Sequence, residues 1–439
     1  MIDIKILREN PELVKATAAK RKCNKEMVDV DALYANDQQY LKLVHETETL
    51  RSERNRLSRE CQSNPEARQK VKELKQELAE KEKLQEELKA KVDEAMTWLP
   101  NMLSPEAPEG ESDADNVEIK RIGQRPVFDF KPRDHQELGD LLGIIDTQRG
   151  AKVAQAGFYY WVGKGAILAQ SMFFWAQKEL AKRGFKVMMS PCAAKARTLF
   201  GTGYLPFFKD QIYPITGEDL CLIGTAEQTL VGYHADETLD GDRLPERLTA
   251  FTPCFRTEAG SYGKESRGIF RVHQFHKVEQ IIFCHPSESP AMMDECLANE
   301  EYFLQQLGIP YHVVNVCLGD LGAPAFKKYD TEAWFPGYNG YRESVREDGA
   351  KCWVPDDDHP GYREVTSNSN LTEFQSRRLN IRFKDADGAK GFVHTISATG
   401  LTDRVVCAIL ENHQRADGSV VVPEVLRPYT GFDVIEPGK

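Results

Sequence analysis

The chain has 439 residues, of which 41% are hydrophobic and 28% charged, close to the values of ordinary globular proteins. This composition excludes wholesale disorder, a collagen-like fibre and a membrane protein. Lys and Arg number 57 against 68 Asp and Glu, giving a net charge of −11. The surface as a whole is therefore unsuited to nonspecific binding of DNA or anionic lipid, although a local basic stripe can still bind a phosphate backbone.

The cell compartment is indicated by what the sequence lacks. The N-terminus carries no secretory signal, and no stretch approaches the roughly 20 apolar residues that span a bilayer. Ten cysteines include no Cys-x-x-Cys pair. These features predict a cytoplasmic protein in a reducing environment, with no membrane partner and no structural zinc.

Residues 1–105 predict an antiparallel helical hairpin. Two runs of apolar residues at steps of three and four flank Asn64-Pro65, which is a turn and helix-start signal. The second helix, about 66–96, would be about 45 Å long. Such a coiled coil is either a spacer or dimerisation element, or an arm that reaches a distant part of a large ligand. The phosphate-binding candidates on it are Arg51, Arg54, Arg56 and Arg59, but interleaved glutamates also fit a solvated mixed-charge face.

After a linker rich in Pro, Gly and Asp, short strand-like runs alternate with amphipathic helices from about residue 116 onward, including a helix over 166–182. This pattern predicts an α+β or α/β body. No Walker P-loop, dinucleotide-binding glycine fingerprint or zinc-protease helix is present. An ATP site in this body would have to use arginines.

Residues 255–279 predict a strand, a loop over 259–268 and a returning strand. Arg256 and Arg271 would then project from facing strands. Alternation would place four side chains on one side of the second strand: Arg271, His273, Phe275 and Glu279. Guanidiniums for phosphates and an aromatic ring for a base make a nucleotide site. A surface hairpin with cross-strand ion pairs is the alternative.

Two further groups carry chemistry. Thr225 and Glu227 follow an apolar run, where a hydroxyl and a carboxylate suit an ammonium group, or where Thr225 simply caps a helix. Arg404 stands at the start of a buried helix, where the helix dipole disfavours a cation. Its position indicates an anionic ligand, or else an ion pair with a nearby carboxylate.

Together these residues resemble one family, the seryl-tRNA synthetases, which are class II aminoacyl-tRNA synthetases. The resemblance covers nearly the whole chain and rests on segments in family order: DNVEIKRIG, FDFKPRDHQELG, LFGTGYLP, EDLCLIGTAEQ, FRTEAGSYGKESRGIFRVHQFHKVE, KKYDTEAWFP, YREVTSNSNLTEFQSRRLNIRF and DGSVVVPEVLRPY. It implies an α+β protein with a coiled-coil arm over 1–105 and a catalytic domain over 106–439. That domain would hold a six-stranded antiparallel sheet flanked by helices, with motif 1 at about 166–191, motif 2 at about 250–280 and motif 3 at about 400–415.

The resemblance also implies the activity. ATP would activate L-serine as seryl-adenylate, which would be transferred to the 3′ end of serine tRNA, with selenocysteine tRNA left open as a second acceptor. The arm would grip the long variable arm of the tRNA, and the enzyme would be a homodimer. A paralogue that activates another small amino acid for a non-tRNA acceptor is the alternative, and a non-enzymatic RNA-binding protein is a third reading.

The residue roles implied by the resemblance fall into three groups. The catalytic residues would be Arg256, Glu279 and Arg404. ATP would be bound by Arg256, Thr257, Glu258, Arg271, Val272, Phe275, Glu364, Val365, Thr366, Ser367 and Arg404, with Mg²⁺ on Glu364 and Ser367. Serine would be bound by Thr225, Ala226, Glu227, Arg256, Glu279 and Thr399.

Two stretches depart from the family pattern. Before Arg404 the family has an Asn-Gly-Ser or Asn-Gly-Thr element, whereas here Ser397 stands in place of the Asn and Thr399 supplies the hydroxyl. An insertion of about twenty residues runs from about 339 to 361. Its Tyr341-Arg342-Glu343 mimics Tyr362-Arg363-Glu364, and the second copy is taken as the site because Ser367 to Asn370 follow it. The Cys, Asp and His residues of the insertion are a minor metal-site hypothesis.

Overall fold

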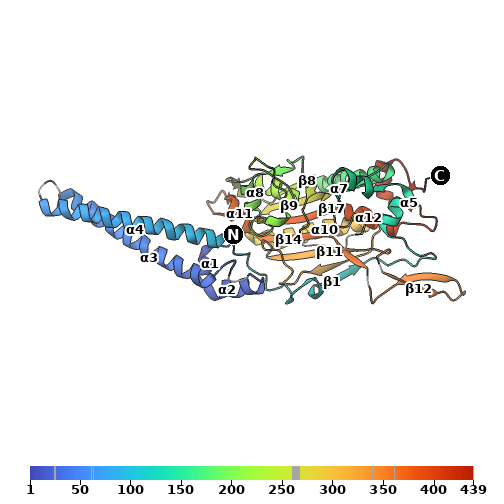
Figure 1. Cartoon of the computed structure of the whole chain (residues 1–439), viewed down its shortest axis with the longest axis horizontal. Coiled ribbons are helices and arrows are strands. Elements are labelled where there is room, and N and C mark those ends of the chain that lie inside the picture. Colours follow the sequence, from blue (N-terminus) through green and yellow to red (C-terminus); the bar gives the residue numbers. More distant parts are fainter. Residues whose placement is uncertain are drawn as a thin grey trace. The chain divides into compact units, whose positions relative to one another are not determined.

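The computed structural model of the chain describes residues 1–23, 26–60, 62, 64–259, 267–338, 340–359 and 361–438. The chain divides into two compact units, Met1–Met102 and Leu103–Lys439, the first drawn in blue in Figure 1. Within the described ranges no helix has both the length and the apolar character that crossing a bilayer requires.

The first unit contains the predicted antiparallel hairpin, which is confirmed. Its helices are α1 (Ile4–Glu9), α2 (Pro11–Lys20), α3 (Val30–Glu60) and α4 (Pro65–Thr97), with α3 and α4 side by side along their length (Figure 1). Pro65 opens α4 with its φ already helical, and the Asn64 side chain accepts hydrogen bonds from the first free amides. A narrow apolar seam that includes Leu74, Leu78 and Leu88 is buried between the helices.

One buried ion pair fixes the base of this unit. Asp37 on α3 is fully buried, and Arg8 on α1 donates Nε and Nη2 to its two carboxylate oxygens at 2.8 Å each. A bidentate guanidinium satisfies both oxygens of the carboxylate that burial would otherwise penalise. The pair therefore joins α1 to α3.

The second unit is built on a sheet of eight strands. Their order is β1 (Val117–Ile122), β10 (Tyr311–Asn315), β11 (Lys327–Trp334), β14 (Tyr362–Thr372), β17 (His394–Thr402), β9 (Gln274–Cys284), β8 (Glu246–Phe255) and β4 (Lys186–Met188). Every neighbouring pair is antiparallel except β4 and β8. The predicted antiparallel α+β sheet is confirmed, but it has two strands more than the implied six, because β1 and the three-residue β4 extend its edges.

Helices cover this sheet (Figure 1). They are α5 (His135–Leu142), α6 (Thr147–Val153), α7 (Lys164–Lys182), α8 (Ala196–Gly201), α9 (Ala226–Gly232), α10 (Ser289–Gln306), α11 (Phe374–Leu379), α12 (Asp403–Asn412) and α13 (Arg427–Thr430). Alternate residues of β14 serve opposite faces. Thr366 and Asn368 hydrogen-bond to α10 on one face, whereas Ser367 and Ser369 line a cavity on the other.

Short strands form five small sheets. They pair β2 (Ile145–Asp146) with β3 (Tyr160–Trp161), β5 (Ala193–Ala194) with β6 (Cys221–Leu222), β12 (Tyr341–Val345) with β13 (Lys351–Pro355), β18 (Val420–Val421) with β19 (Val434–Ile435), and β15 (Arg382–Lys384) with both β16 (Lys390–Phe392) and β7 (Thr238–Asp240). The predicted insertion is thus an antiparallel hairpin, β12–β13, tied to the body by a bridge between Trp353 and Phe128. Asn339 and Pro360 lie outside the described residues.

Candidate active site

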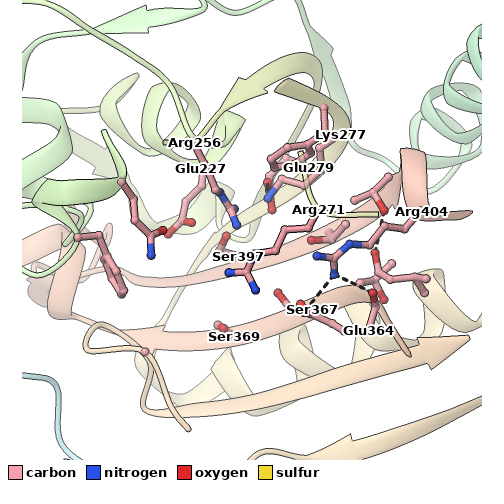
Figure 2. Close-up of a pocket in the computed structure, with 18 of the residues that line it drawn as sticks. Glu227, Arg256, Arg271, Lys277, Glu279, Glu364, Ser367, Ser369, Ser397 and Arg404 are labelled. Atoms are coloured by element: carbon pink, nitrogen blue, oxygen red, sulfur yellow. Dashed lines mark hydrogen bonds and ion pairs between the residues drawn. The ribbon is translucent and has the colours of Figure 1, made fainter. Parts of the chain in front are cut away.

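The sheet face opposite α10 carries a cavity of about 310 Å³. β9, β14 and β17 form its floor, and Figure 2 shows Ser367 and Ser369 on β14 beside Ser397 on β17. Charged side chains from neighbouring loops and from the start of α12 surround this floor. The cavity therefore combines a rigid base with a strongly polar wall.

Strands β8 and β9 pair antiparallel as predicted, but the second strand starts later than expected. It begins at Gln274, so Arg271 and His273 precede it, and Arg256 follows the end of β8. Residues 267–273 instead run through turns and bends, with Gly268 in the left-handed region at φ +71°, so the extended strand cannot start before them. Residues 260–266 of the predicted loop lie outside the described residues.

Two arginine–glutamate pairs line the cavity. Arg271 Nε lies 2.6 Å from Glu258 Oε2. Arg404 donates to the Glu364 carbonyl at 2.8 Å and lies 3.3 Å from its carboxylate (Figure 2), while its guanidinium stacks 4.6 Å from the centre of the Phe270 ring. Burial favours the neutral acid, but the nearby cations Lys328, Arg404 and Arg256 outweigh it and lower the pKa of Glu364 below its ordinary value.

The other end of the cavity contains a network of buried acids. Thr225 caps α9 by accepting from the Glu227 amide at 3.1 Å, so the capping reading is correct. The same hydroxyl donates to Glu279 Oε2 at 2.5 Å, which links the cap to the cavity. Glu279 also forms a very short ion pair with Lys277.

Glu227 has a different environment. Tyr204 Oη and Gln375 Nε2 donate to its two oxygens at 3.2 and 2.6 Å, and both donors are neutral. Within the described residues no Lys or Arg forms an ion pair with it. Burial and then repulsion from Glu279 raise the pKa of Glu227 to about 7.

The charges that line the cavity are almost all paired. The ion pairs are Arg271 with Glu258, Arg404 with Glu364, Lys277 with Glu279, and Lys328 with Asp330. Asp403 accepts from Trp161 Nε1 and from the backbone and ring of His276. Among the described lining residues, Arg256 and Glu227 remain without an ionic partner, and Arg256 donates only weakly to the Gly224 carbonyl at 3.4 Å.

Most of the residues predicted for the site line this cavity: Glu227, Arg256, Glu258, Arg271, Val272, Phe275, Glu279, Glu364, Val365, Thr366, Ser367, Thr399 and Arg404. Three predicted residues are not among the lining residues. Thr225 and Ala226 are buried behind it, and Thr257 donates its hydroxyl to the Asp210 carbonyl. Glu343, from the mimic in the insertion, lies on the β12–β13 hairpin instead.

The structure adds lining residues to which sequence reasoning gave no role. Lys277 is on β9 between Phe275 and Glu279, so period-two alternation alone could have found it. Lys328 and Ser369 lie opposite each other on β11 and β14, and Asp403 is anchored by Trp161. These three depend on the order of strands in the sheet, which no local pattern of the sequence reveals.

The remaining candidates are in the arm and the insertion. Arg51 forms an ion pair across the hairpin with Glu82 at 2.7 Å, and Arg56 lies 3.3 Å from Glu60. Arg54 donates to the Asn55 side chain at 3.0 Å, and Arg59 is exposed near the end of α3. In the described part of the chain no group of three or more His, Cys, Asp or Glu is arranged to hold a metal ion. The insertion therefore offers no such group among its described residues.

Comparison with known proteins covers both units. Residues 1–103 match the family described as seryl-tRNA synthetase N-terminal domain, and residues 213–413 match the tRNA synthetase class II core domain (G, H, P, S and T). Serine–tRNA ligase of Treponema denticola is 41% identical, covering 99% of this chain and 100% of the relative, and that of Thermobifida fusca is 42% identical, covering 100% and 99%.

Solved structures agree. The seryl-tRNA synthetase of Pyrococcus horikoshii complexed with ATP superposes with a TM-score of 0.91 at 38% identity, covering 100% of both chains. The cytoplasmic serine–tRNA ligase of Naegleria fowleri in complex with AMP gives 0.86 at 29% identity, covering 100% of this chain and 99% of that one. The matches to both family descriptions, the full-length relatives and the superposed structures agree, and the chain belongs to the seryl-tRNA synthetase family of class II aminoacyl-tRNA synthetases.

Proposed function

We propose that this protein activates L-serine with ATP to seryl-adenylate and transfers the seryl group to the 3′ end of serine tRNA. The observation that carries the proposal is the pair of side chains without ionic partners, Arg256 and Glu227. One free guanidinium and one free carboxylate in a single cavity complement the carboxylate and the ammonium of an amino-acid zwitterion. The family and the ATP and AMP complexes of its relatives support the nucleotide half of the reaction.

In the proposed first step a serine carboxylate oxygen attacks the α-phosphorus of ATP, and the bond to the pyrophosphate oxygen breaks. Arg256 would bind the carboxylate and the α-phosphate and so offset the repulsion between two anions. Arg271 and Arg404 would bind the outer phosphates, with adenine on Phe275 and Glu258. Orientation and electrostatic stabilisation carry such a step, which needs no protein nucleophile.

A magnesium ion would be held by Glu364 and Ser367. The donor set fits, because Mg²⁺ prefers hard oxygen ligands and both side chains line the cavity from β14. The buried Asp330 Oδ1, which has no hydrogen-bond partner, adds an unsatisfied oxygen on the neighbouring strand, opposite Ser367. When bound, the ion would neutralise phosphate charge, while Arg404 keeps Glu364 ionised and oriented.

We also propose that the arm binds tRNA. Arg54, Arg56 and Arg59 on α3 are the candidate phosphate contacts, whereas Arg51 is engaged with Glu82 and is better explained as a stabiliser of the hairpin. Shape-directed recognition of a long variable arm needs phosphate contacts rather than base-reading residues. Among the described cysteines, all are free thiols, which supports a reducing, cytoplasmic location.

A homodimer is proposed from an apolar surface around motif 1. Large exposed apolar side chains occur on α6, on α7, on β4 and directly after it: Val153, Ile167, Phe174, Val187 and Met189. Exposed apolar clusters of this kind mark interaction sites. A second copy of the chain is the proposed partner.

The test is amino-acid-dependent exchange of pyrophosphate into ATP with serine, threonine, alanine and glycine, followed by charging of serine tRNA. We expect exchange with serine and charging of a tRNA with a long variable arm. Exchange with another amino acid and none with serine would refute the proposal. Exchange with serine without charging would instead favour a non-tRNA acceptor.

A further inference from the structure

We infer that Lys277 decides which carboxylate of the cavity receives the substrate's ammonium group, and thereby selects an uncharged hydroxyl side chain over a cationic one. This inference rests on the proposed function. Lys277 lies two residues before Glu279 on β9, so the two side chains share the cavity face of the strand. Figure 2 shows both at the same corner of the cavity.

Two polar contacts meet on one carboxylate oxygen of Glu279. Lys277 pairs with Oε2, and the Thr225 hydroxyl donates to the same oxygen at 2.5 Å. Both side chains are buried: the exposed fraction is 2% for Glu279 and 9% for Lys277. A buried carboxylate already compensated by an ammonium gains little from a second one, but it remains a good hydrogen-bond acceptor.

Glu227 is the complementary case. Its donors, Tyr204 and Gln375, hold the carboxylate in place without neutralising it. A substrate ammonium would therefore gain the most by binding to Glu227. The Glu279 carboxylate is then left to accept a hydrogen bond from the serine hydroxyl, and Lys277 holds that carboxylate in position.

This assignment of the two carboxylates makes a prediction about a close analogue of serine. L-2,3-diaminopropionate carries a side-chain amine where serine has its hydroxyl. In the parent protein that second ammonium would approach Glu279 beside the like-charged Lys277 and be disfavoured. Removing the lysine charge would leave Glu279 uncompensated and available to bind it.

The experiment measures pyrophosphate exchange, as kcat/KM, with both amino acids for the parent, Lys277→Met, Lys277→Gln, Lys277→Arg and a Lys384→Met control. Lys384 is exposed on β15 and outside the cavity. For the two neutral variants we expect the diaminopropionate-to-serine ratio to rise by about tenfold or more, because a like charge beside the bound ammonium is removed. The KM for ATP should change by less than about twofold, and Lys277→Arg should keep the parent preference.

The outcomes separate the two proposals. A parent protein without serine-dependent exchange refutes the proposed function. A parent active with serine, together with neutral variants that lose activity equally for both amino acids, would make Lys277 merely structural and overturn this inference alone. Because two neutral replacements of different polarity are compared, and each is checked for a parent-like circular dichroism spectrum, misfolding of one leaves the other to decide.

Discussion

Glu227, to which we assign the substrate ammonium, is proposed to weaken the fold that holds it. Burial and the neighbouring Glu279 raise its pKa from 4.5 to about 7, so the unfolded chain gives up this proton at a lower pH than the folded one. Stability is therefore lost as the pH rises from about 4.5 to about 7 and stays reduced above that. The raised pKa of Glu227 lowers the free energy of unfolding by about 3 kcal/mol at pH 8 and by about 1 kcal/mol at pH 5.

Glu227→Gln should therefore unfold at a higher urea concentration than the parent at pH 8, and the difference should shrink towards pH 5. The same variant should lose serine-dependent exchange, because the substrate ammonium has no carboxylate to bind. Equilibrium urea unfolding at several pH values measures the first effect. A variant that is less stable than the parent at pH 8 would contradict this account of the carboxylate.

Glu300 on α10 is a second buried acid of this protein. It is completely buried, and burial raises its pKa well above the ordinary value, which favours the neutral acid. Thr331 and Thr366 donate to Oε2 at 3.0 and 2.8 Å. Glu300→Gln keeps the shape and an acceptor oxygen and carries no charge, and should change the free energy of unfolding by less than about 1 kcal/mol.

Glu300→Ala should instead destabilise the protein by about 3 kcal/mol, since it leaves a cavity and two hydroxyls without their acceptor. Thermal unfolding of the two variants side by side measures the difference. Equal effects of the two replacements would show that the acid, rather than its shape and acceptor oxygen, is what the fold requires.

Among single residues, the sequence predicted those that lie in a recognisable local segment. Arg256, Glu279 and Arg404 stand in recognisable segments, and the structure brings all three to one cavity. Lys328 and Asp403 were missed because their roles arise from contacts across strands and with Trp161, which local spacing does not encode.

Among the elements, α1 and α3 are joined at the base of the arm by the buried ion pair of Arg8 and Asp37. Arg8→Met would leave the buried Asp37 carboxylate uncompensated and should cost about 3 kcal/mol. We expect faster hydrogen–deuterium exchange of the amides in α1 and the start of α3. Lys15→Met is the matched control, because Lys15 and Asp31 are both exposed and such pairs contribute less than about 1 kcal/mol. Equal rates of hydrogen–deuterium exchange in the two variants would show that the buried ion pair stabilises the arm no more than the exposed one does.

The long helices were predictable because their apolar seam repeats over many turns, and the start signal at Asn64-Pro65 placed α4 closely. The start of β9 was not predictable, because Ile269 and Phe270 are as apolar as strand residues although they lie in turns and bends that follow the left-handed Gly268. The β12–β13 hairpin was recognised only as an insertion, since its pairing depends on a turn and a bridge to Phe128 rather than on a strong strand pattern.

For the whole molecule, the two compact units predict separable activities. A variant that begins at Leu103 should retain serine-dependent pyrophosphate exchange, because the described lining of the cavity comes entirely from the second unit. Charging of serine tRNA should fall by about a hundredfold or more, as expected when a set of phosphate contacts is removed. Loss of exchange in a folded variant would contradict this separation.

The proposed dimer is tested on the same scale. Phe174 on α7 is 56% exposed, within the apolar surface around motif 1. Phe174→Asp should convert a dimer into a monomer in analytical ultracentrifugation, because burying an unpaired carboxylate at an interface is unfavourable. Val345→Asp on the β12–β13 hairpin, also a large exposed apolar position, is the control that should not change the mass. A monomeric parent protein would refute the dimer itself.

Net charge proved a poor guide to the partner, because −11 describes the sum and the proposed polyanion contacts only a few local arginines. The two-unit division was readable from composition, whereas the eight-strand order needed three-dimensional contacts between segments far apart in the chain.

The hairpin of α3 and α4 also bears on how the chain is made. Its buried contacts close within the first 102 residues, and helix–helix contacts of this local kind form rapidly. The sheet, by contrast, places β1 beside β10 and β4 beside β8, so its ladder cannot be completed until late segments have been synthesised. During translation the arm can reach its final form on the ribosome while the strands that follow it still wait for their neighbours. We therefore expect chaperones to bind the second unit, rather than the arm, while the chain is being synthesised.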